Sequence, residues 1–349
     1  MLDFLLVLIF SGHLLLVDVA IAGPLFCVWL DWRARRNGDD AAAAIGRRLA
    51  AWAVFATSLG IAAGLGLWQI VEHLPGQERY LRVFNAIPAS RWWGIVSELA
   101  FYLVVMGVYW ATWNRWRLEK WRRWRWLHGA LAIVAVTTLA FHFPPLFARV
   151  SAISTRPEVA EKLADGEEFR TRYIFQDAET MARTAHHLLA SLAVVGIVVA
   201  GMAAQSSVPL LDRRQMDEQS TKTLPGVGQA VPHAVRQIGI AAARMSLLAT
   251  LLQLPVGVWV MLQLPSPARD QILGGDPFGM AIFLAALVCV LGLLHHLAAL
   301  ALGDLTCRKV YVTGVILILT TLLMTGMLHR TRTDVYRQLD VLQKPTATP

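Results

Sequence analysis

The chain has 349 residues, of which 56% are hydrophobic and only 16% are charged, whereas a soluble domain is about 25% charged. This composition excludes an ordinary soluble protein and favours a single bundle of membrane-spanning helices. The formal net charge of +8 does not indicate a nucleic-acid partner, because the basic residues of membrane proteins gather in their cytoplasmic loops.

Eight apolar stretches predict eight membrane spans, since a helix needs about 20 apolar residues to cross a bilayer. They cover residues 4–30, 48–72, 92–113, 126–148, 184–205, 237–263, 278–301 and 309–328. The first stretch has no basic segment before it, so we expect a retained span and not a cleaved signal peptide. The predicted fold is an all-α polytopic membrane protein with about eight transmembrane helices in a bundle.

The charged connections predict the orientation of this bundle. The 31–48 and 114–125 connections are rich in arginine, whereas the 149–183 connection is acidic. Because Lys and Arg concentrate on the cytoplasmic side, the basic connections are expected inside and both termini outside. We expect the bacterial inner (cytoplasmic) membrane as the location, and a short amphipathic helix within 157–182 on the outer surface.

Three regions follow from this pattern. Residues 1–205 hold five spans and the acidic outer connection at 149–183. Residues 206–236 are polar, with Pro and Gly, and are expected to form an inner loop. Residues 237–349 hold three further spans and a short outer tail.

Ionisable residues at membrane depth are functional hypotheses, because their burial is costly. Asp18, near the middle of the first span, could be a proton relay or a hydrogen-bond partner for a neighbouring helix. Glu98, in the outer third of the third span, could act at a catalytic site or pair with a histidine. Arg244 could hold a cofactor carboxylate, or its long side chain could reach the inner interface.

Histidines are the most informative of these residues. The predicted orientation places His13, His142, His186 and His187 in the outer half, and His128, His295 and His296 in the inner half. The sequence has neither a Cys-x-x-Cys-His motif for covalent haem attachment nor a His-Glu-x-x-His zinc motif. Single histidines or methionines on separate helices suit the axial ligands of a b-type haem, and one to three haems could be held.

Two haem arrangements remain open. In the first, an outer-side cluster uses His13, His186 and Met280, with Glu98 and His142 nearby. In the second, His128 and His142 are 14 residues apart, which places them on nearly one helix face about 21 Å apart. That spacing resembles the cytochrome b of bc complexes. His186 or His187 would then complete an outer haem, and His295 or His296 an inner one.

Four segments resemble subunit I of cytochrome bd quinol oxidases: SGHLLLVDVAIAGPLF at 11–26, GLGLW at 64–68, LAFHFPPLF at 139–147 and ARTAHHLLASLAVVG at 182–196. The resemblance covers about residues 1–205. It implies that His13 binds a high-spin haem and His186 a low-spin haem, whose second ligand would be Met280 in PFGM. His142 would belong to the same haem-binding region.

The departures from that family bear on the electron donor. The long quinol-oxidising loop and its Gly-Arg-Gln-Pro-Trp motif are absent, and only Glu98 stands where the family has two glutamates. The resemblance implies a haem-b membrane subunit of a respiratory complex with other membrane subunits. Its electron donor is either a c-type cytochrome or a quinol, and it could be an oxidoreductase that reduces oxygen. Two alternatives are a two-haem electron-transfer subunit and a haem-free, proton-coupled transporter.

Overall fold

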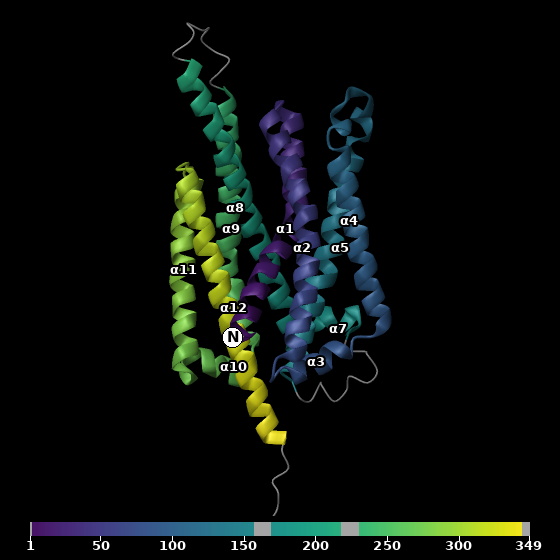
Figure 1. Ribbon diagram of the computed structural model, residues 1–349, viewed down its shortest axis with the longest axis vertical. Helices are drawn as coiled ribbons and strands as arrows, with labels where there is room; N and C mark the ends of the chain where they lie inside the picture. The colour runs from purple at the N-terminus through teal and green to yellow at the C-terminus, as the bar shows by residue number, and fades with distance from the viewer. Residues whose placement is uncertain (1, 157–168, 218–229, 344–349) are drawn as a thin grey trace, which may run out of the picture.

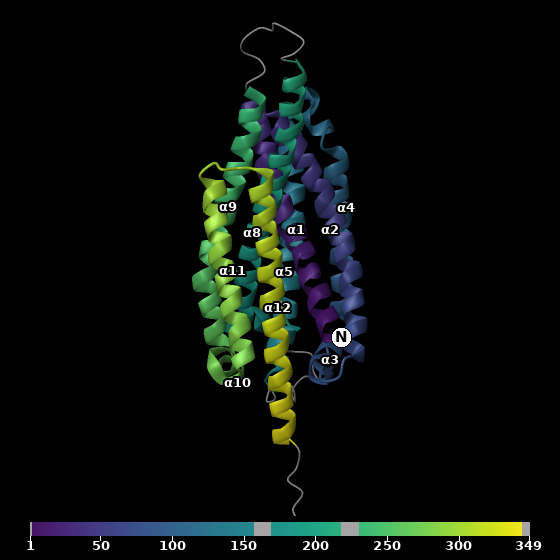
Figure 2. The ribbon, with the colours of Figure 1, turned by 60° about the vertical axis from the view of Figure 1, so that its left-hand side comes forward.

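The computed structural model describes residues 2–156, 169–217 and 230–343, and all regular structure in these ranges is helical. Eight helices are long and apolar enough to cross a membrane, which confirms the eight predicted spans. They lie side by side along the long axis of the molecule (Figures 1 and 2). The chain is an integral membrane protein.

The eight spanning helices are α1 (Leu2–Asn37), α2 (Asp40–His73), α4 (Ala89–Thr112), α5 (Arg125–Ser154), α8 (Ala178–Asp217), α9 (Ala230–Gln263), α11 (Pro277–Ala301) and α12 (Cys307–Gln343). Short helical segments connect them: α3 (Glu78–Asn85), the 3₁₀ turns η1 (Arg115–Arg117) and η2 (Glu119–Trp124), α7 (Thr171–Gln176), α10 (Ser266–Asp270) and the π-helical turn η5 (Gln271–Gly275).

Helices α1 and α8 form the centre of the bundle. Helix α1 packs against α2, α5 and α8, and α8 packs most extensively against α9. Helices α11 and α12 pair on one flank, while α4 and α5 lie on the other (Figure 1). Helix α8 is also the most buried span, so side chains on α1 and α8 point into the interior of the bundle.

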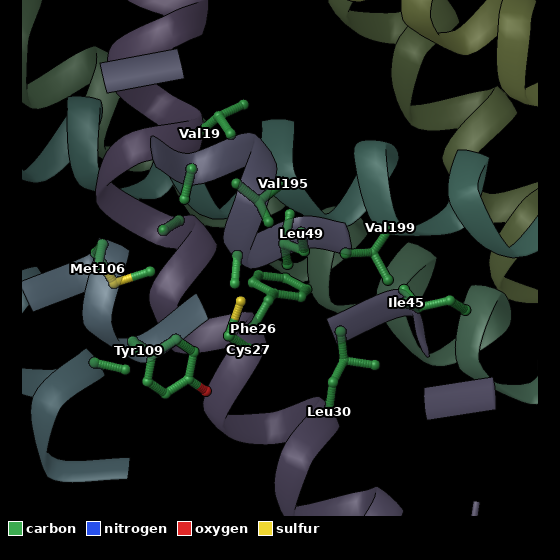
Figure 3. Close-up of a cluster of buried hydrophobic side chains, with 14 of the residues drawn as sticks. Val19, Phe26, Cys27, Leu30, Ile45, Leu49, Met106, Tyr109, Val195 and Val199 are labelled. Atoms are coloured by element: carbon green, nitrogen blue, oxygen red, sulfur yellow. The ribbon is translucent and has the colours of Figure 1, made fainter. Parts of the chain in front are cut away.

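The core is packed by apolar and small side chains where α1, α2, α4 and α8 meet. Phe26, Leu49, Met106 and Val195 belong to one cluster of buried residues (Figure 3). Close approach of α8 and α9 depends on Gly196, because a Cβ atom there would lie 2.7 Å from the Ala242 carbonyl oxygen. Small residues at such contacts allow membrane helices to pack closely.

The two ends of the bundle differ in their charge and in the segments that form them. The N-terminal end of α1, the C-terminal end of α12 and the short helices α3, α7 and α10 lie at one end (Figure 1). The α1–α2 and α4–α5 connections, which carry the basic clusters, lie at the other. Because basic connections favour the cytoplasmic side, the end that holds the start of α1 and the end of α12 is the predicted outer end.

Several connections are shorter than the sequence indicates. Only Gly38 and Asp39 separate α1 from α2, with Gly38 at φ +64° and Asp39 capping α2 by accepting the Ala42 N–H at 3.0 Å. The expected inner loop at 206–236 is also reduced, since α8 continues to Asp217 and α9 begins at Ala230. Charged residues and alanine are good helix formers, so helices extend beyond the apolar windows.

The predicted outer helix within 157–182 can be checked only in part. Helix α7 (Thr171–Gln176) and the start of α8 lie in this segment. Residues 157–168, which carry most of its acidic side chains, are outside the described residues.

Candidate functional site

The adjacent histidines of α8 face two different helices. Successive residues of an α-helix are rotated by about 100°, and the contacts follow this rotation. The His187 Nδ1 atom lies 3.6 Å from Asp18 Oδ1 on α1. The His186 ring instead lies against α9, where a Cβ atom on Gly257 would be 3.8 Å from His186 Cε1.

Asp18, His187 and Ser191 form a polar group between α1 and α8, which we call the outer cluster together with His13. Ser191 Oγ donates a hydrogen bond of 2.7 Å to Asp18 Oδ1 and bonds the His187 carbonyl oxygen at 3.0 Å. Asp18 and Ser191 are both buried. His13 lies within electrostatic range of His187. The structure therefore gives Asp18 the hydrogen-bond partner that the sequence left open.

His13 is held by the glycine-rich face of α2. Its Nδ1 atom lies 2.9 Å from the Gly60 carbonyl oxygen, to which it must donate because a carbonyl only accepts. This fixes the tautomer and leaves a lone pair on Nε2, the form in which histidine binds a metal. A Cβ atom on Gly64 would come within 3.2 Å of His13 Cε1, so the ring occupies space left by that glycine.

His186 has a different environment. Its Nδ1 atom is buried and has no hydrogen-bond partner among the described residues. A buried polar atom without a partner costs about 1–3 kcal/mol, so such atoms call for an explanation, including a bound group. On the α9 side, Gln253 Nε2 donates to the His186 carbonyl oxygen at 3.5 Å, which leaves the imidazole itself available.

Glu98 and His142 pair with each other between α4 and α5. Glu98 Oε1 lies 3.1 Å from His142 Nδ1, and 43% of the His142 side chain is exposed. Arg91 and Leu146 also line the small cavity at this pair, whose volume is about 20 Å³. Among the described residues, no hydrogen bond or ion pair joins Glu98 or His142 to the outer cluster.

The remaining candidates lie apart from the outer cluster. His128 is buried at the inner end, and its Nε2 lies 3.0 Å from the Tyr109 carbonyl oxygen. His295 is exposed on α11, and its ring lies 5.5 Å from the ring of His296 between centroids. Met280 is exposed at the start of α11. Arg244 Nε donates to the Ala301 carbonyl oxygen at 3.0 Å, which stabilises the last turn of α11.

Sequence reasoning missed the partners that complete these sites. Ser191 lies one helical turn after His187, a spacing that places both on one face and could have indicated it. Gly60 and Gly64 were visible only as a small-residue stretch. Gly257 and Gln253 carry no signal of their own, because only the packing of α9 on α8 brings them to His186.

Comparison with known proteins gives a match to a solved structure. No protein-family model and no curated protein matches the chain. A solved structure of bd oxidase from Geobacillus thermodenitrificans aligns over 98% of this chain and 88% of the other, with a TM-score of 0.61 and 14% sequence identity. The chain has the fold of bd oxidase. At 14% identity the likeness establishes the fold alone, so the site must be argued from its own residues.

Proposed function

We propose that the chain is a haem-b-binding membrane subunit of a bd-oxidase-like respiratory electron-transfer complex. The observation that carries the proposal is the pair of available imidazoles at His13 and His186. Each lies on a central helix in the outer half and beside a glycine of the neighbouring helix. The bd oxidase fold of the whole chain supports the same assignment.

The residues fit a haem in two respects. His13 has its Nδ1 bonded to a backbone carbonyl, the arrangement that orients a metal-binding histidine. His186 has a buried ring nitrogen whose bonding capacity no described residue satisfies. His13 and His186 would be the iron ligands, and a bound haem would supply a one-electron carrier. Met280 and His142 would be candidates for a further iron ligand.

Around the proposed haem, the protein's own residues supply groups that can hold protons. Asp18 and His187 lie 3.6 Å apart with Ser191 bonded to the carboxylate, so a proton can reside on either side chain. Glu98 and His142 form a second carboxylate–imidazole pair, open to the surface of the bundle. We assign Asp18 and Glu98 as proton-handling residues of an oxidoreductase, which would transfer electrons and could reduce oxygen.

The setting of the proposed complex is the bacterial inner membrane, with further membrane subunits as partners. The outer end carries the candidate haem ligands, so an electron donor would act from that side. A c-type cytochrome in the outer aqueous phase and a quinol within the bilayer are the two donor classes. The two-haem arrangement that uses His128 has less support, because the free Nδ1 atom of His128 faces Asp31 Oδ2 at 3.6 Å and the Tyr109 ring stacks on the imidazole at 3.9 Å.

The test is spectroscopic and uses single substitutions in the purified full-length protein. His13→Ala should remove a carbon-monoxide-reactive, high-spin component, and His186→Ala should remove a low-spin band. His73→Ala is the control, because His73 is exposed and bonds only the Gln69 carbonyl oxygen in its own helix. Bands that survive both ligand substitutions would contradict the assignment, and a protein without haem would favour the proton-coupled transporter.

A further inference from the structure

A second polar site lies at the inner end of the bundle, between α1, α4 and α5. Its centre is His128, which is 1% exposed. The Tyr109 ring stacks on the imidazole at 3.9 Å between centroids and 10° between planes, and the Trp116 ring lies at 5.8 Å and 29°. Trp113 approaches the imidazole edge-on at 5.6 Å. His128 is therefore enclosed by aromatic rings.

The hydrogen bonds fix where protons must sit on this imidazole. Nε2 lies 3.0 Å from the Tyr109 carbonyl oxygen and must donate to it. Nδ1 lies 3.6 Å from Asp31 Oδ2. In a neutral ring this Nδ1 would present a lone pair to a carboxylate, two acceptors facing each other. A proton on Nδ1, or a water between the two atoms, makes the contact attractive.

The surroundings favour the protonated ring. Arg35 binds the same carboxylate oxygen of Asp31 at 2.7 Å, which favours an ionised Asp31 as counter-ion to His128. Aromatic faces attract a cation stacked on them, and Tyr109 and Trp116 supply two such faces. The charged or titratable groups that face the pair are Cys27 and Arg35 from α1 and Tyr109 from α4, while α5 contributes the Arg125 carbonyl oxygen, to which Arg35 donates.

Unpaired polar atoms concentrate at the same place. Six buried side-chain nitrogen or oxygen atoms in the described ranges lack a hydrogen-bond partner, and four of them belong to this group: Tyr109 Oη, Trp113 Nε1, Trp116 Nε1 and His128 Nδ1. Buried polar atoms of this kind are normally satisfied by internal water. The group thus has the chemistry of a hydrated site and not of a dry apolar core.

The site is connected to the inner surface. The Arg35 side chain is 27% exposed, whereas the Asp31 side chain is 7% exposed. Arg35 also reaches the Arg125 carbonyl oxygen at 3.5 Å, at the basic connection between α4 and α5. Water at the inner surface can therefore approach Asp31 along the exposed guanidinium.

We propose that His128 and Asp31 form a proton-binding site that is loaded from the inner aqueous phase. The proton resides on His128 Nδ1, with Asp31 as its counter-ion and Arg35 at the entrance. Proton binding here does not depend on a haem. Only the use of this proton during electron transfer rests on the proposed function.

The first experiment measures the protonation of His128 by nitrogen-15 NMR of histidine-labelled full-length protein in lipid nanodiscs. One histidine should carry protons on both ring nitrogens, and His128→Gln should remove that signal. Asp31→Asn keeps the shape of the side chain and should weaken the signal of the doubly protonated ring, because the variant lacks the counter-ion. A His128 ring that stays neutral from about pH 5 to pH 9 would overturn the proposal.

His73→Gln is the matched control, because it should remove a different signal and leave that of His128 unchanged. The second experiment measures proton uptake with a pH-indicating dye when the purified protein is reduced in weakly buffered solution. Asp31→Asn should lower the number of protons taken up while the haem spectrum stays the same. Unchanged proton uptake would contradict the proposal that His128 and Asp31 take a proton from the inner aqueous phase. If the protein holds no haem, the proposed function fails, whereas the NMR measurement still decides whether His128 binds the proton.

Discussion

At the scale of single residues, the two adjacent histidines of α8 show that neighbours in one helix can contact two different helices. His187 lies toward Asp18 on α1, and His186 lies toward Gly257 on α9. The sequence predicts that the rings diverge, because neighbours in a helix differ by about 100°. It could not predict which helix each would meet, since that depends on the order of helices around α8.

Asp31 shows a different limit of sequence reasoning. It lies at the end of the first predicted span beside several arginines, where a carboxylate is unremarkable. In the structure it is buried and lies against Arg35 and His128. Its role emerges only because α5 carries His128 to the inner end of α1, a contact between residues nearly 100 positions apart.

Ser191→Ala should destabilise the protein measurably. The substitution removes the 2.7 Å hydrogen bond to Asp18 and leaves a buried carboxylate short of a donor, which costs about 1–3 kcal/mol. Thermal unfolding in detergent measures the effect. The control is Ser58→Ala, whose exposed hydroxyl bonds only the Val54 carbonyl oxygen in its own helix. An equal melting temperature for both variants would contradict a stabilising outer cluster.

At the scale of elements, the eight helices were predictable because apolar length alone decides which segments span a bilayer. Their ends were less predictable. Helices α1 and α2 continue past their apolar windows to a two-residue turn, because the polar caps and alanines at 37–44 favour helix. Helix packing also depends on single glycines, and a hydropathy profile does not show which glycines lie at helix contacts.

Gly196→Ala should separate α8 from α9. The new Cβ atom would lie 2.7 Å from the Ala242 carbonyl oxygen and from Ser246 Cβ, which requires one helix to shift. His186 faces α9, so we expect a lower melting temperature together with a loss of low-spin haem. The matched control is Gly107→Ala on α4, where no atom lies within 4 Å of the added Cβ. Retention of full haem content by Gly196→Ala would contradict the coupling of this packing to the site.

The junction of α5 and α8 at the outer end should weaken in acid. Burial raises the pKa of the Asp177 carboxyl, but hydrogen bonds from Thr180 and Arg156 outweigh burial and hold its pKa below the ordinary value. A depressed pKa in the folded state means that Asp177 contributes stability above its unfolded pKa of about 3.9. That contribution is lost as the pH falls through the folded-state pKa.

The measurement for this junction is the melting temperature of the wild type and of Asp177→Asn from about pH 6 down to pH 3. The wild type should lose stability more steeply, because the variant has no carboxylate to protonate. Arg156 and Arg149, which lie 2.7 and 3.2 Å from Asp177, are present in both proteins. Parallel curves would show that Asp177 does not contribute to the acid response.

At the scale of the whole molecule, the basic connections predict the orientation, and the structure places both described ends of the chain at the opposite end of the bundle from these connections. Contacts there tie α12 to α1 and to α5. His329 Nε2 lies 2.9 Å from Asp3 Oδ1, and Ser154 and Tyr336 share a hydrogen bond of 2.6 Å. No sequence pattern predicted these contacts, because they join residues that are far apart in the sequence.

The natural cysteines test this orientation. Cys307 is exposed at the start of α12 on the inner end, whereas Cys27 is buried in the core. A membrane-impermeant thiol reagent should label the protein in inside-out vesicles and not in right-side-out vesicles, and Cys307→Ser should remove the label. Labelling from the outer side would contradict the predicted topology.

The central claim is that this bundle holds haem b through His13 and His186. The most direct measurement is a pyridine haemochrome count on the purified full-length protein, which identifies the haem type and its number per chain. The account predicts haem b, from one to three per chain, with a loss of one upon His186→Ala. A protein that purifies folded and without haem would contradict it.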